Sequence, residues 1–330
     1  MAGRKSDLDW FKVEINNRFD IKHKARLGNE KHDVKAVRNL NRVITWTRGG
    51  IQYEADQRHA EIIIRELGLK EAKSVDTPCV KDACAVAGNG DWEDTMYRAL
   101  TARLNYLGQD RPDLQYATKE ACRSMASPDA KSWGKLKRAG RYLVGRGRLL
   151  RLFRFGEAPE HITGWSDTDF AGCPNTRKST SGGVVMWGTS CLRTWSNNQD
   201  VVALSSGEAE YYGLVKTATN SIGLKSLLAD MGVMVNIELI TDASAALGIA
   251  CRRGVGRVRH LEVQELWLQH QVAAKHLSIT KVRTDRNIAD VFTKCVTSQR
   301  MAWAMRSINL YYADGRHQLA PSADAGVTGV

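Results

Sequence analysis

The stretch His161–Gly172, HITGWSDTDFAG, places two aspartates, Asp167 and Asp169, at the end of a run with the pattern of a β-strand. An unpaired carboxylate is costly to bury, so a core strand rarely carries one. Asp167 is therefore either an ordinary turn residue or a ligand for a cation. The elements that follow along the chain decide between these two interpretations.

The chain after residue 157 alternates between expected strands and helices. Apolar runs of strand length and helical periodicity predict strands over 161–167, 182–192, 201–205, 235–242 and 277–283, and helices over 206–231, 260–274 and 287–308. Three strands, then helices interleaved with two more strands, is the order of an α/β protein. We expect a mixed five-stranded sheet flanked by helices.

Four carboxylates fall at the ends of these elements, namely Asp167, Glu208, Asp242 and Asp290. The edge of an α/β sheet where strands end and helices begin is the usual place for a ligand site. Carboxylates gathered there repel one another and need divalent cations, and hard oxygen ligands favour Mg²⁺ or Mn²⁺ over zinc.

Each carboxylate also has an ordinary interpretation. Asp167 fits a turn, Glu208 fits the third position of a capping box in SSGE, and Asp242 and Asp290 fit helix starts. Glu210, two positions after Glu208 on the same helix, should point elsewhere and lie on the surface.

The composition favours an anionic partner. The 330 residues carry a formal net charge of +12, which suits nucleic acid better than a membrane surface. We expect two domains and an intracellular protein, cytoplasmic or nuclear, because no signal peptide or transmembrane run is present. The seven cysteines contain no CxxC pair, so we expect reduced thiols and no zinc site.

The first half of the chain is organised differently. Its patterns predict a hairpin over 40–55, a helix over 57–69, a linker over 81–91 and helices over 94–142. The segment 131–154 holds nine cations and no acid, which predicts either a solvated helix face or phosphate contacts by Lys135, Arg138 and Arg141. Trp133 and Tyr142 within it either stack on bases or pack in the core.

Five segments together resemble the ribonuclease H domain of copia-type retrotransposon Pol polyproteins. They are GWSDTDFAGCPNTRKSTSGGVV (164–185), ALSSGEAEYYGL (203–214), LITDASAAL (239–247), RHLEVQELWLQ (259–269) and IADVFTK (288–294). The segments 97–128 and 59–69 are similar to the connection region and the end of the reverse transcriptase thumb. No Tyr-x-Asp-Asp motif is present, so we expect no polymerase activity from this chain.

The resemblance implies an order of regions. Residues 1–75 are expected to be a remnant of the reverse transcriptase palm and thumb, 76–156 a helical connection region with a basic stretch, 157–312 a ribonuclease H-like α/β domain, and 313–330 a disordered tail. The remaining Pol polypeptide is a possible partner.

The resemblance also implies an activity, two-metal hydrolysis of the RNA strand of RNA–DNA hybrids. Asp167, Glu208, Asp242 and Asp290 match the family's catalytic and metal-binding quartet, with two Mg²⁺ ions, or Mn²⁺, as cofactors. Some related enzymes use a mobile histidine before the last aspartate, but KVRTDRN (281–287) contains none. The expected contacts to the nucleic acid are Arg177, Lys178, Ser179, Thr180, Ser205, Ser206 and Lys294.

Two competing functions remain open. The first is a catalytically inactive, nucleic-acid-binding remnant of a Pol protein, which the missing polymerase motif favours. The second is an integrase-like strand transferase, which shares the fold and the metals but needs a different order of acids and usually a zinc-binding domain.

Overall fold

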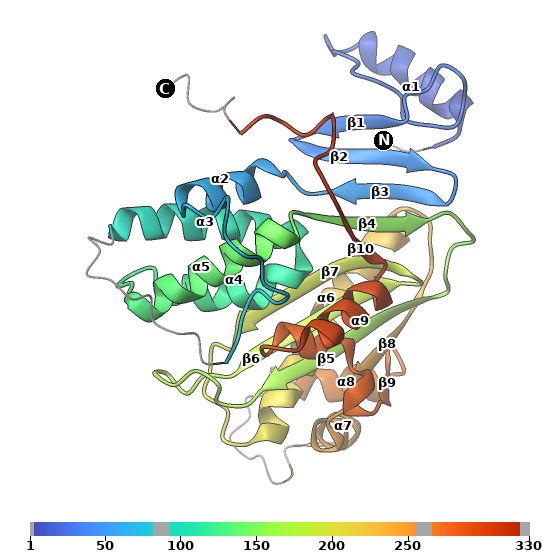
Figure 1. Ribbon diagram of the computed structural model, residues 1–330. Coiled ribbons are helices and arrows are strands. Elements are labelled where there is room, and N and C mark those ends of the chain that lie inside the picture. The colour runs from blue at the N-terminus through green and yellow to red at the C-terminus, as the bar shows by residue number, and fades with distance from the viewer. Residues whose placement is uncertain (1–2, 82–92, 255, 257–265, 324–330) are drawn as a thin grey trace.

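The computed structural model describes residues 3–81, 93–254, 256 and 266–323. Its strands form two five-stranded sheets, in the orders β1-β2-β3-β4-β10 and β7-β6-β5-β8-β9 (Figure 1). No described helix is both long enough and apolar enough to cross a bilayer.

The first sheet is antiparallel throughout. Its strands are β1 (Ala36–Asn39), β2 (Arg42–Thr47), β3 (Gly50–Glu54), β4 (Arg148–Arg154) and β10 (Leu310–Ala313). The predicted hairpin over 40–55 is present as β2 and β3. A β-carbon on Gly50, where φ is 156°, would lie 2.1 Å from the Phe153 carbonyl oxygen, so only glycine lets β3 approach β4 there.

A helical layer packs beside this sheet. It consists of α2 (Arg58–Glu66), α3 (Asp94–Asp110), the 3-10 turn η1 (Pro112–Leu114), α4 (Gln115–Cys122) and α5 (Ala130–Gly145), while α1 (Lys5–Asn16) buries none of its residues. Trp133 and Tyr142 of α5 are 2% and 1% exposed in the core of this layer, so they pack and do not stack on bases. The predicted linker lies outside the described residues except for Lys81.

The second sheet belongs to the part of the chain that contains the four predicted carboxylates. Its strands are β5 (His161–Asp169), β6 (Thr180–Trp187), β7 (Ser190–Asn198), β8 (Asn236–Thr241) and β9 (Ser278–Lys281). The strand pairs β5–β6 and β6–β7 are antiparallel, whereas β5–β8 and β8–β9 are parallel. This mixed sheet confirms the predicted ribonuclease H-like fold class.

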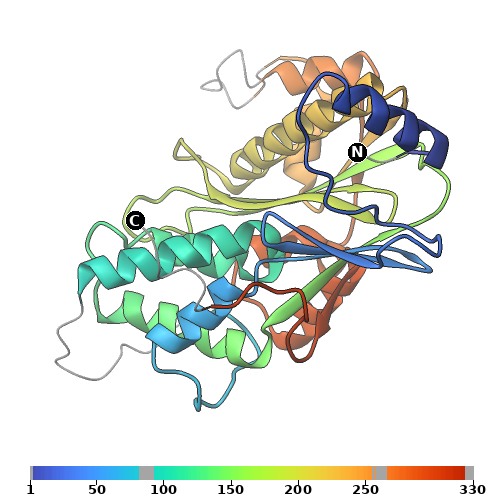
Figure 2. The ribbon, with the colours of Figure 1, turned by 90° about the horizontal axis from the view of Figure 1, so that it is seen from above.

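Helices cover both faces of the second sheet. On one face lie α6 (Ser206–Asp230), α7 (Ser244–Cys251) and α8 (Trp267–Ala273). On the other lie the 3-10 turn η4 (Ile288–Phe292) and α9 (Ser298–Ser307), preceded by η3 (Thr284–Arg286). Figure 2 shows the yellow helix α6 and the red helix α9 on opposite sides of the strands.

Several local predictions differ from the structure. Residues 182–192 are two strands joined by a turn, residues 201–205 form no strand, and the last helical segment opens as the 3-10 turn η4. Strand β10 joins the sheet of the first half of the chain, and Arg316 in the expected disordered tail pairs with Glu61 of α2. The division into domains stays a prediction.

Candidate active site

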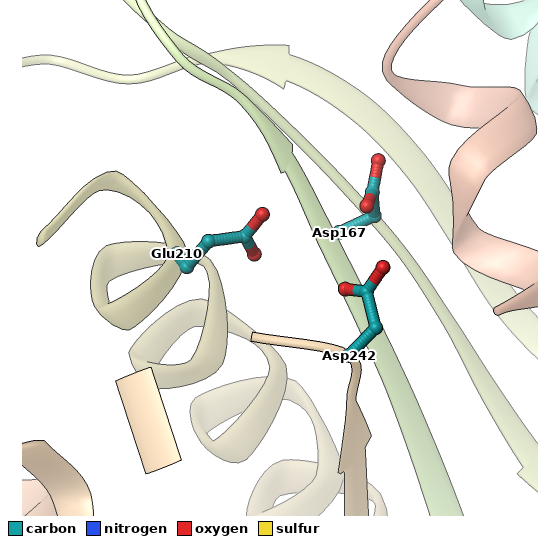
Figure 3. A group of neighbouring side chains, drawn as sticks. All are labelled: Asp167, Glu210 and Asp242. Atoms are coloured by element: carbon teal, nitrogen blue, oxygen red, sulfur yellow. The ribbon is translucent and has the colours of Figure 1, made fainter. Parts of the chain in front are cut away.

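Three carboxylates from three elements meet at one edge of the second sheet. Asp167, Glu210 and Asp242 each place an oxygen within 4.8 Å of the others, and Figure 3 shows the side chains pointing toward one another. Asp167 and Asp242 come from the neighbouring parallel strands β5 and β8, and Glu210 comes from the helix α6 above them. Two of the four predicted residues therefore meet there, together with one that the prediction placed elsewhere.

Asp167 lies near the end of β5, which continues to Asp169. Its register partner on β6 is Gly182, where a β-carbon would lie 2.7 Å from side-chain atoms of Phe292 and Thr293, so the glycine allows η4 to pack directly on the sheet. The Thr293 hydroxyl then donates a hydrogen bond to Oδ2 of Asp167, which is 5% exposed. The turn η4 thereby orients the carboxylate.

Glu210 reaches the site because α6 approaches β5 closely. A β-carbon on Gly213 would lie 2.4 Å from Oγ1 of Thr168, so only glycine permits this contact one helical turn after Glu210. The approach brings Oε1 of Glu210 within 3.3 Å of the Thr168 backbone N–H, which donates to it. The prediction that Glu210 is a surface residue is wrong, since it is half-buried in the cluster.

Glu208 does not join the cluster. Two positions along a helix turn a side chain by about 200°, so Glu208 and Glu210 point in nearly opposite directions. Glu208 is 1% exposed, its Oε2 accepts from the Leu204 N–H at 3.1 Å, and its own N–H donates to the Ser205 hydroxyl at 3.2 Å. The capping-box interpretation describes Glu208, and the structure places Glu210, not Glu208, beside Asp167 and Asp242.

Asp242 follows the last residue of β8 and is half-buried. Nδ2 of Asn287 lies 3.4 Å from its Oδ1. A surface cavity borders Asp242 and is lined by Lys281, Val282, Arg283, Thr284 and Asp285. Sequence reasoning missed Asn287 and the two cations of this cavity, because no periodicity brings these segments together.

Asp290 lies in η4 close to the cluster but is not one of its three members. It is 8% exposed, its Oδ1 pairs with Nζ of Lys294 at 2.5 Å, and its Oδ2 lies 3.5 Å from Nε of Arg300. Lys294 itself keeps 51% of its side chain exposed. The fourth predicted carboxylate is thus compensated by two cations of its own segment.

The environment of the cluster raises the pKa of two of its acids, Glu210 and Asp167. Burial, together with the charges of Asp167 and Asp242, raises the pKa of Glu210 to about 9. Burial also raises the pKa of Asp167 to about 6; the Thr293 hydrogen bond and the Lys294 charge oppose this, and Asp290 and Asp242 add to it. The carboxylates of Asp167, Glu210 and Asp242 therefore repel one another when ionised, and the positive charge of Lys294 compensates them only in part.

Asp169 has a different environment from Asp167. Burial raises its pKa, and Lys119 of α4 and Lys294 oppose that rise. A β-carbon on Gly172 would lie 1.5 Å from its Oδ2, so the chain folds back against this carboxylate. Asp169 borders the junction with the helical layer and does not enter the cluster.

The predicted nucleic-acid contacts between β5 and β6 differ in their exposure to solvent. Arg177 is exposed and Lys178 is half-buried. Ser179 and Thr180 are fully buried, with the Ser179 hydroxyl accepting from the Ala171 N–H at 3.0 Å and the Thr180 hydroxyl accepting from Lys119 at 2.8 Å. The prediction that Ser179 and Thr180 contact nucleic acid is wrong, because internal hydrogen bonds occupy both hydroxyls.

The remaining predicted contacts also have internal partners. Lys135 pairs with Glu120 at 3.2 Å, Arg138 donates to the Thr77 hydroxyl at 2.9 Å, and Arg141 donates to the Lys73 carbonyl at 2.8 Å. At the start of α6, Ser205 caps the helix, and Ser206 follows it in the first turn; both are exposed. Ser205 and Ser206 therefore lie two turns or less from Glu210 on an open surface.

Comparison with known proteins finds similar sequences. The chain is 26% identical over 268 residues to the retrovirus-related Pol polyprotein from transposon TNT 1-94 of Nicotiana tabacum, which covers 78% of this chain and 20% of that protein. It is 28% identical over 245 residues to the corresponding polyprotein from transposon RE2 of Arabidopsis thaliana, covering 73% of this chain and 17% of that protein.

This chain is a homologue of copia-type retrotransposon Pol polyproteins. It spans about a fifth of the length of these relatives. No protein-family model matches it. Among solved structures, the N-terminal ribonuclease H domain of rv2228c from Mycobacterium tuberculosis aligns with a TM-score of 0.31 at 20% identity, covering 44% of this chain and 97% of that one.

Proposed function

We propose that this Pol homologue is a metal-dependent endonuclease of the ribonuclease H type that hydrolyses the RNA strand of RNA–DNA hybrids. The observation that supports it most directly is the convergence of Asp167, Glu210 and Asp242 from three separate elements. Like charges held together in a partly buried cluster are a feature of sites that bind a cation. The substrate is inferred from the resemblance of the surrounding segments to Pol ribonuclease H domains.

The donor set fits a divalent cation. Three carboxylates supply hard oxygen ligands, which favour Mg²⁺ or Mn²⁺. A divalent cation bound by such residues polarises a phosphodiester and lowers the pKa of water. Asp167, Glu210 and Asp242 would hold it, while Thr293 and Asn287 fix the carboxylates of Asp167 and Asp242.

A second ion would need Asp290 as a ligand. Lys294 and Arg300 already compensate this carboxylate, so the two-ion form of the mechanism requires at least Lys294 to move toward the substrate. Lys294 is suited to that, because half of its side chain is exposed and its charge is felt by Asp167 and Asp242. We place Lys294 at the scissile phosphate as a charge-assisted donor.

The surface around the site supplies further contacts to the nucleic acid. The cavity beside Asp242 is lined by Lys281, which donates to the Ser244 hydroxyl, and by Arg283, which pairs with Asp285; each would exchange that partner for a neighbouring phosphate. On the other side, the exposed hydroxyls of Ser205 and Ser206 lie at the start of α6, where they can meet ribose 2′-hydroxyls across a minor groove. Sequence-independent contacts on both sides of a cleavage site suit a duplex substrate.

The competing function is a non-catalytic nucleic-acid-binding remnant, and the compensation of Asp290 by Lys294 and Arg300 favours it. An assay distinguishes the two. A labelled RNA–DNA hybrid is incubated with the protein in Mg²⁺, in Mn²⁺ and in chelator, alongside Glu210→Gln. Cleavage that needs the metal and Glu210 supports the enzyme, whereas tight binding without cleavage in either metal supports the remnant.

A further inference from the structure

The side chain of Asn287 contacts β5, Asp242 at the end of β8, and η4, and the first two of these contribute carboxylates to the candidate site. We infer that Asn287 is a positioning residue that holds the ends of β5 and β8 and the start of η4 in the arrangement the cation needs. The inference rests on the proposed metal site, and it assigns a role to a residue that touches neither substrate nor cation. Asn287 is fully buried.

Every polar atom of this amide has a partner. Nδ2 donates to the backbone carbonyl of Ser166 at 2.8 Å, the residue before Asp167, and lies 3.4 Å from Oδ1 of Asp242. Oδ1 accepts from the backbone N–H of Ala289 at 3.1 Å, one residue before Asp290. One side chain therefore contacts the backbone beside two of the predicted carboxylates and the carboxylate of the third.

The chemistry of the contacts requires an amide. A carboxylate at position 287 has no donor for the Ser166 carbonyl and adds a negative charge against Asp242, and a serine hydroxyl is too short to reach across to β5. The Nδ2 hydrogen bond to one oxygen of Asp242 limits the rotation of that carboxylate. Restricting ligands in this way is how neighbouring side chains raise the affinity of a metal site.

The backbone of Asn287 is itself held from the opposite face. Arg300 of α9 donates to the carbonyls of Asn287 at 2.7 Å and of Thr284 at 3.2 Å, and its Nε faces Asp290. The guanidinium stacks on Trp303, with 4.2 Å from its central carbon to the ring centroid. A side chain that bridges strands works as a positioning group only where its own main chain is fixed, and Arg300 fixes it.

The test measures Mn²⁺ binding by calorimetry on the full chain, so that it does not depend on activity. Asn287→Ser keeps a side-chain acceptor for the Ala289 N–H, because serine caps helix starts well, but loses the contacts to Ser166 and Asp242. Asn309→Ala is the matched control, since Asn309 is also a buried amide, donating to the Thr189 carbonyl at 2.7 Å away from the site.

We expect Asn287→Ser to weaken Mn²⁺ binding by about tenfold, the lower end of what neighbours of metal ligands contribute, and Asn309→Ala to leave it unchanged. Equal Mn²⁺ affinity in Asn287→Ser and the unmodified chain, or an equal loss in both variants, overturns the inference. Asp242→Asn separates this from the proposed function: if the unmodified chain and Asp242→Asn bind Mn²⁺ alike, the metal site itself fails.

Discussion

Helix α5 and the edge of the second sheet each gather charges of one sign, but only at the sheet edge do these charges face one another. On α5, Lys135, Arg138 and Arg141 turn to Glu120, Thr77 and the Lys73 carbonyl. At the sheet edge, Asp167, Glu210 and Asp242 turn toward each other. The first group stabilises the fold, whereas the second raises its free energy.

The difference shows which charge clusters indicate a function. A run of cations is stabilising when each finds an internal acceptor, and its sign then says little about a partner. A group of partly buried acids with little internal compensation takes up protons or binds a cation, and such a group therefore points to a functional site. Glu208 and Glu210 repeat this contrast within two residues. Each carboxylate accepts a backbone N–H, from Leu204 and from Thr168 respectively, but only that of Glu210 faces two other carboxylates.

The largest expected effect separates these two glutamates. Glu210→Gln should lower hybrid cleavage by more than about 100-fold, because even the neighbours of metal ligands commonly contribute 10–100-fold. Glu208→Gln should keep most of the activity, because glutamine serves equally well in a capping box. Initial cleavage rates in saturating Mg²⁺ test the pair, and the reverse ranking would restore Glu208 as the ligand.

Part of the candidate site could be predicted from the sequence, but the choice between Glu208 and Glu210 could not be made from strand and helix ends alone. Asp167 and Asp242 were predictable, because strand ends in an α/β order meet at one edge of the sheet. The choice between Glu208 and Glu210 depends on which face of α6 meets β5, and Gly213, Thr217 and Ser221 mark that face as small residues at helical spacing after Glu210. The pattern is present in the sequence, but the prediction of Glu208 rests on its place in the first turn of the helix and on the match to the family quartet.

Other features could not be predicted from local patterns. The pairing of β10 with β4 joins residues about 160 positions apart, and the bridge from Asn287 to Ser166 spans 121 positions. Neither has a periodic or turn signal, because contacts at such separation depend on how whole layers pack. For the same reason the internal partners of Arg138 and Arg141 on the segment 73–77 were not predictable from the basic run.

A second prediction concerns the most deeply buried charge pair. Arg111 and Asp113 are each 1% exposed, with Nη2 and Oδ2 2.7 Å apart, and Tyr142 also donates to Asp113 at 2.8 Å. Asp113→Ala should lower the free energy of unfolding by about 3–5 kcal/mol, because it leaves a buried guanidinium uncompensated.

Urea unfolding of Asp113→Ala and of Asp242→Asn, both without metal, checks this contrast. We expect Asp242→Asn to be as stable as the unmodified chain or more stable, since it relieves repulsion with Asp167 and Glu210. If Asp242→Asn unfolds as easily as Asp113→Ala, the sheet-edge acids are internally compensated and the distinction between the two regions is lost.

The pH dependence follows from the raised pKa values. The pKa of Glu210 rises from 4.5 to about 9 and that of Asp167 from 3.8 to about 6. Groups whose pKa is raised by folding contribute stability below their unfolded pKa, and this contribution is lost as the pH rises through the folded pKa. The metal-free Tm should therefore fall between pH 4 and pH 9.

Mg²⁺ should act in the opposite direction, because it binds the ionised carboxylates and competes with their protons. At 10 mM, Mg²⁺ is in modest excess over a dissociation constant of about 1 mM and should raise the Tm. This increase in Tm should be larger at pH 9 than at pH 6. Glu210→Gln should reduce the pH dependence in both the presence and the absence of metal. Differential scanning calorimetry at the two pH values measures the Tm with and without Mg²⁺. A Mg²⁺-induced increase in Tm that does not depend on pH would contradict the proposed metal site at Asp167, Glu210 and Asp242.

The smallest expected effect concerns the cations. Each Lys or Arg that binds a phosphate changes the slope of log affinity against log salt by about 0.9. Lys294→Ala should lower that slope for hybrid binding by about this amount, because half of the Lys294 side chain is exposed and we expect it to exchange Asp290 for the phosphate. Arg138→Ala and Arg141→Ala should leave the slope unchanged, because both guanidiniums keep their acceptors on 73–77. Fluorescence anisotropy in chelator between 50 and 200 mM salt, a range over which such contacts are readily measured, compares the three variants. A reduced slope in Arg138→Ala or Arg141→Ala would mean that these cations of α5 leave their internal partners to bind the duplex. Cations with internal partners could then still form a nucleic-acid surface.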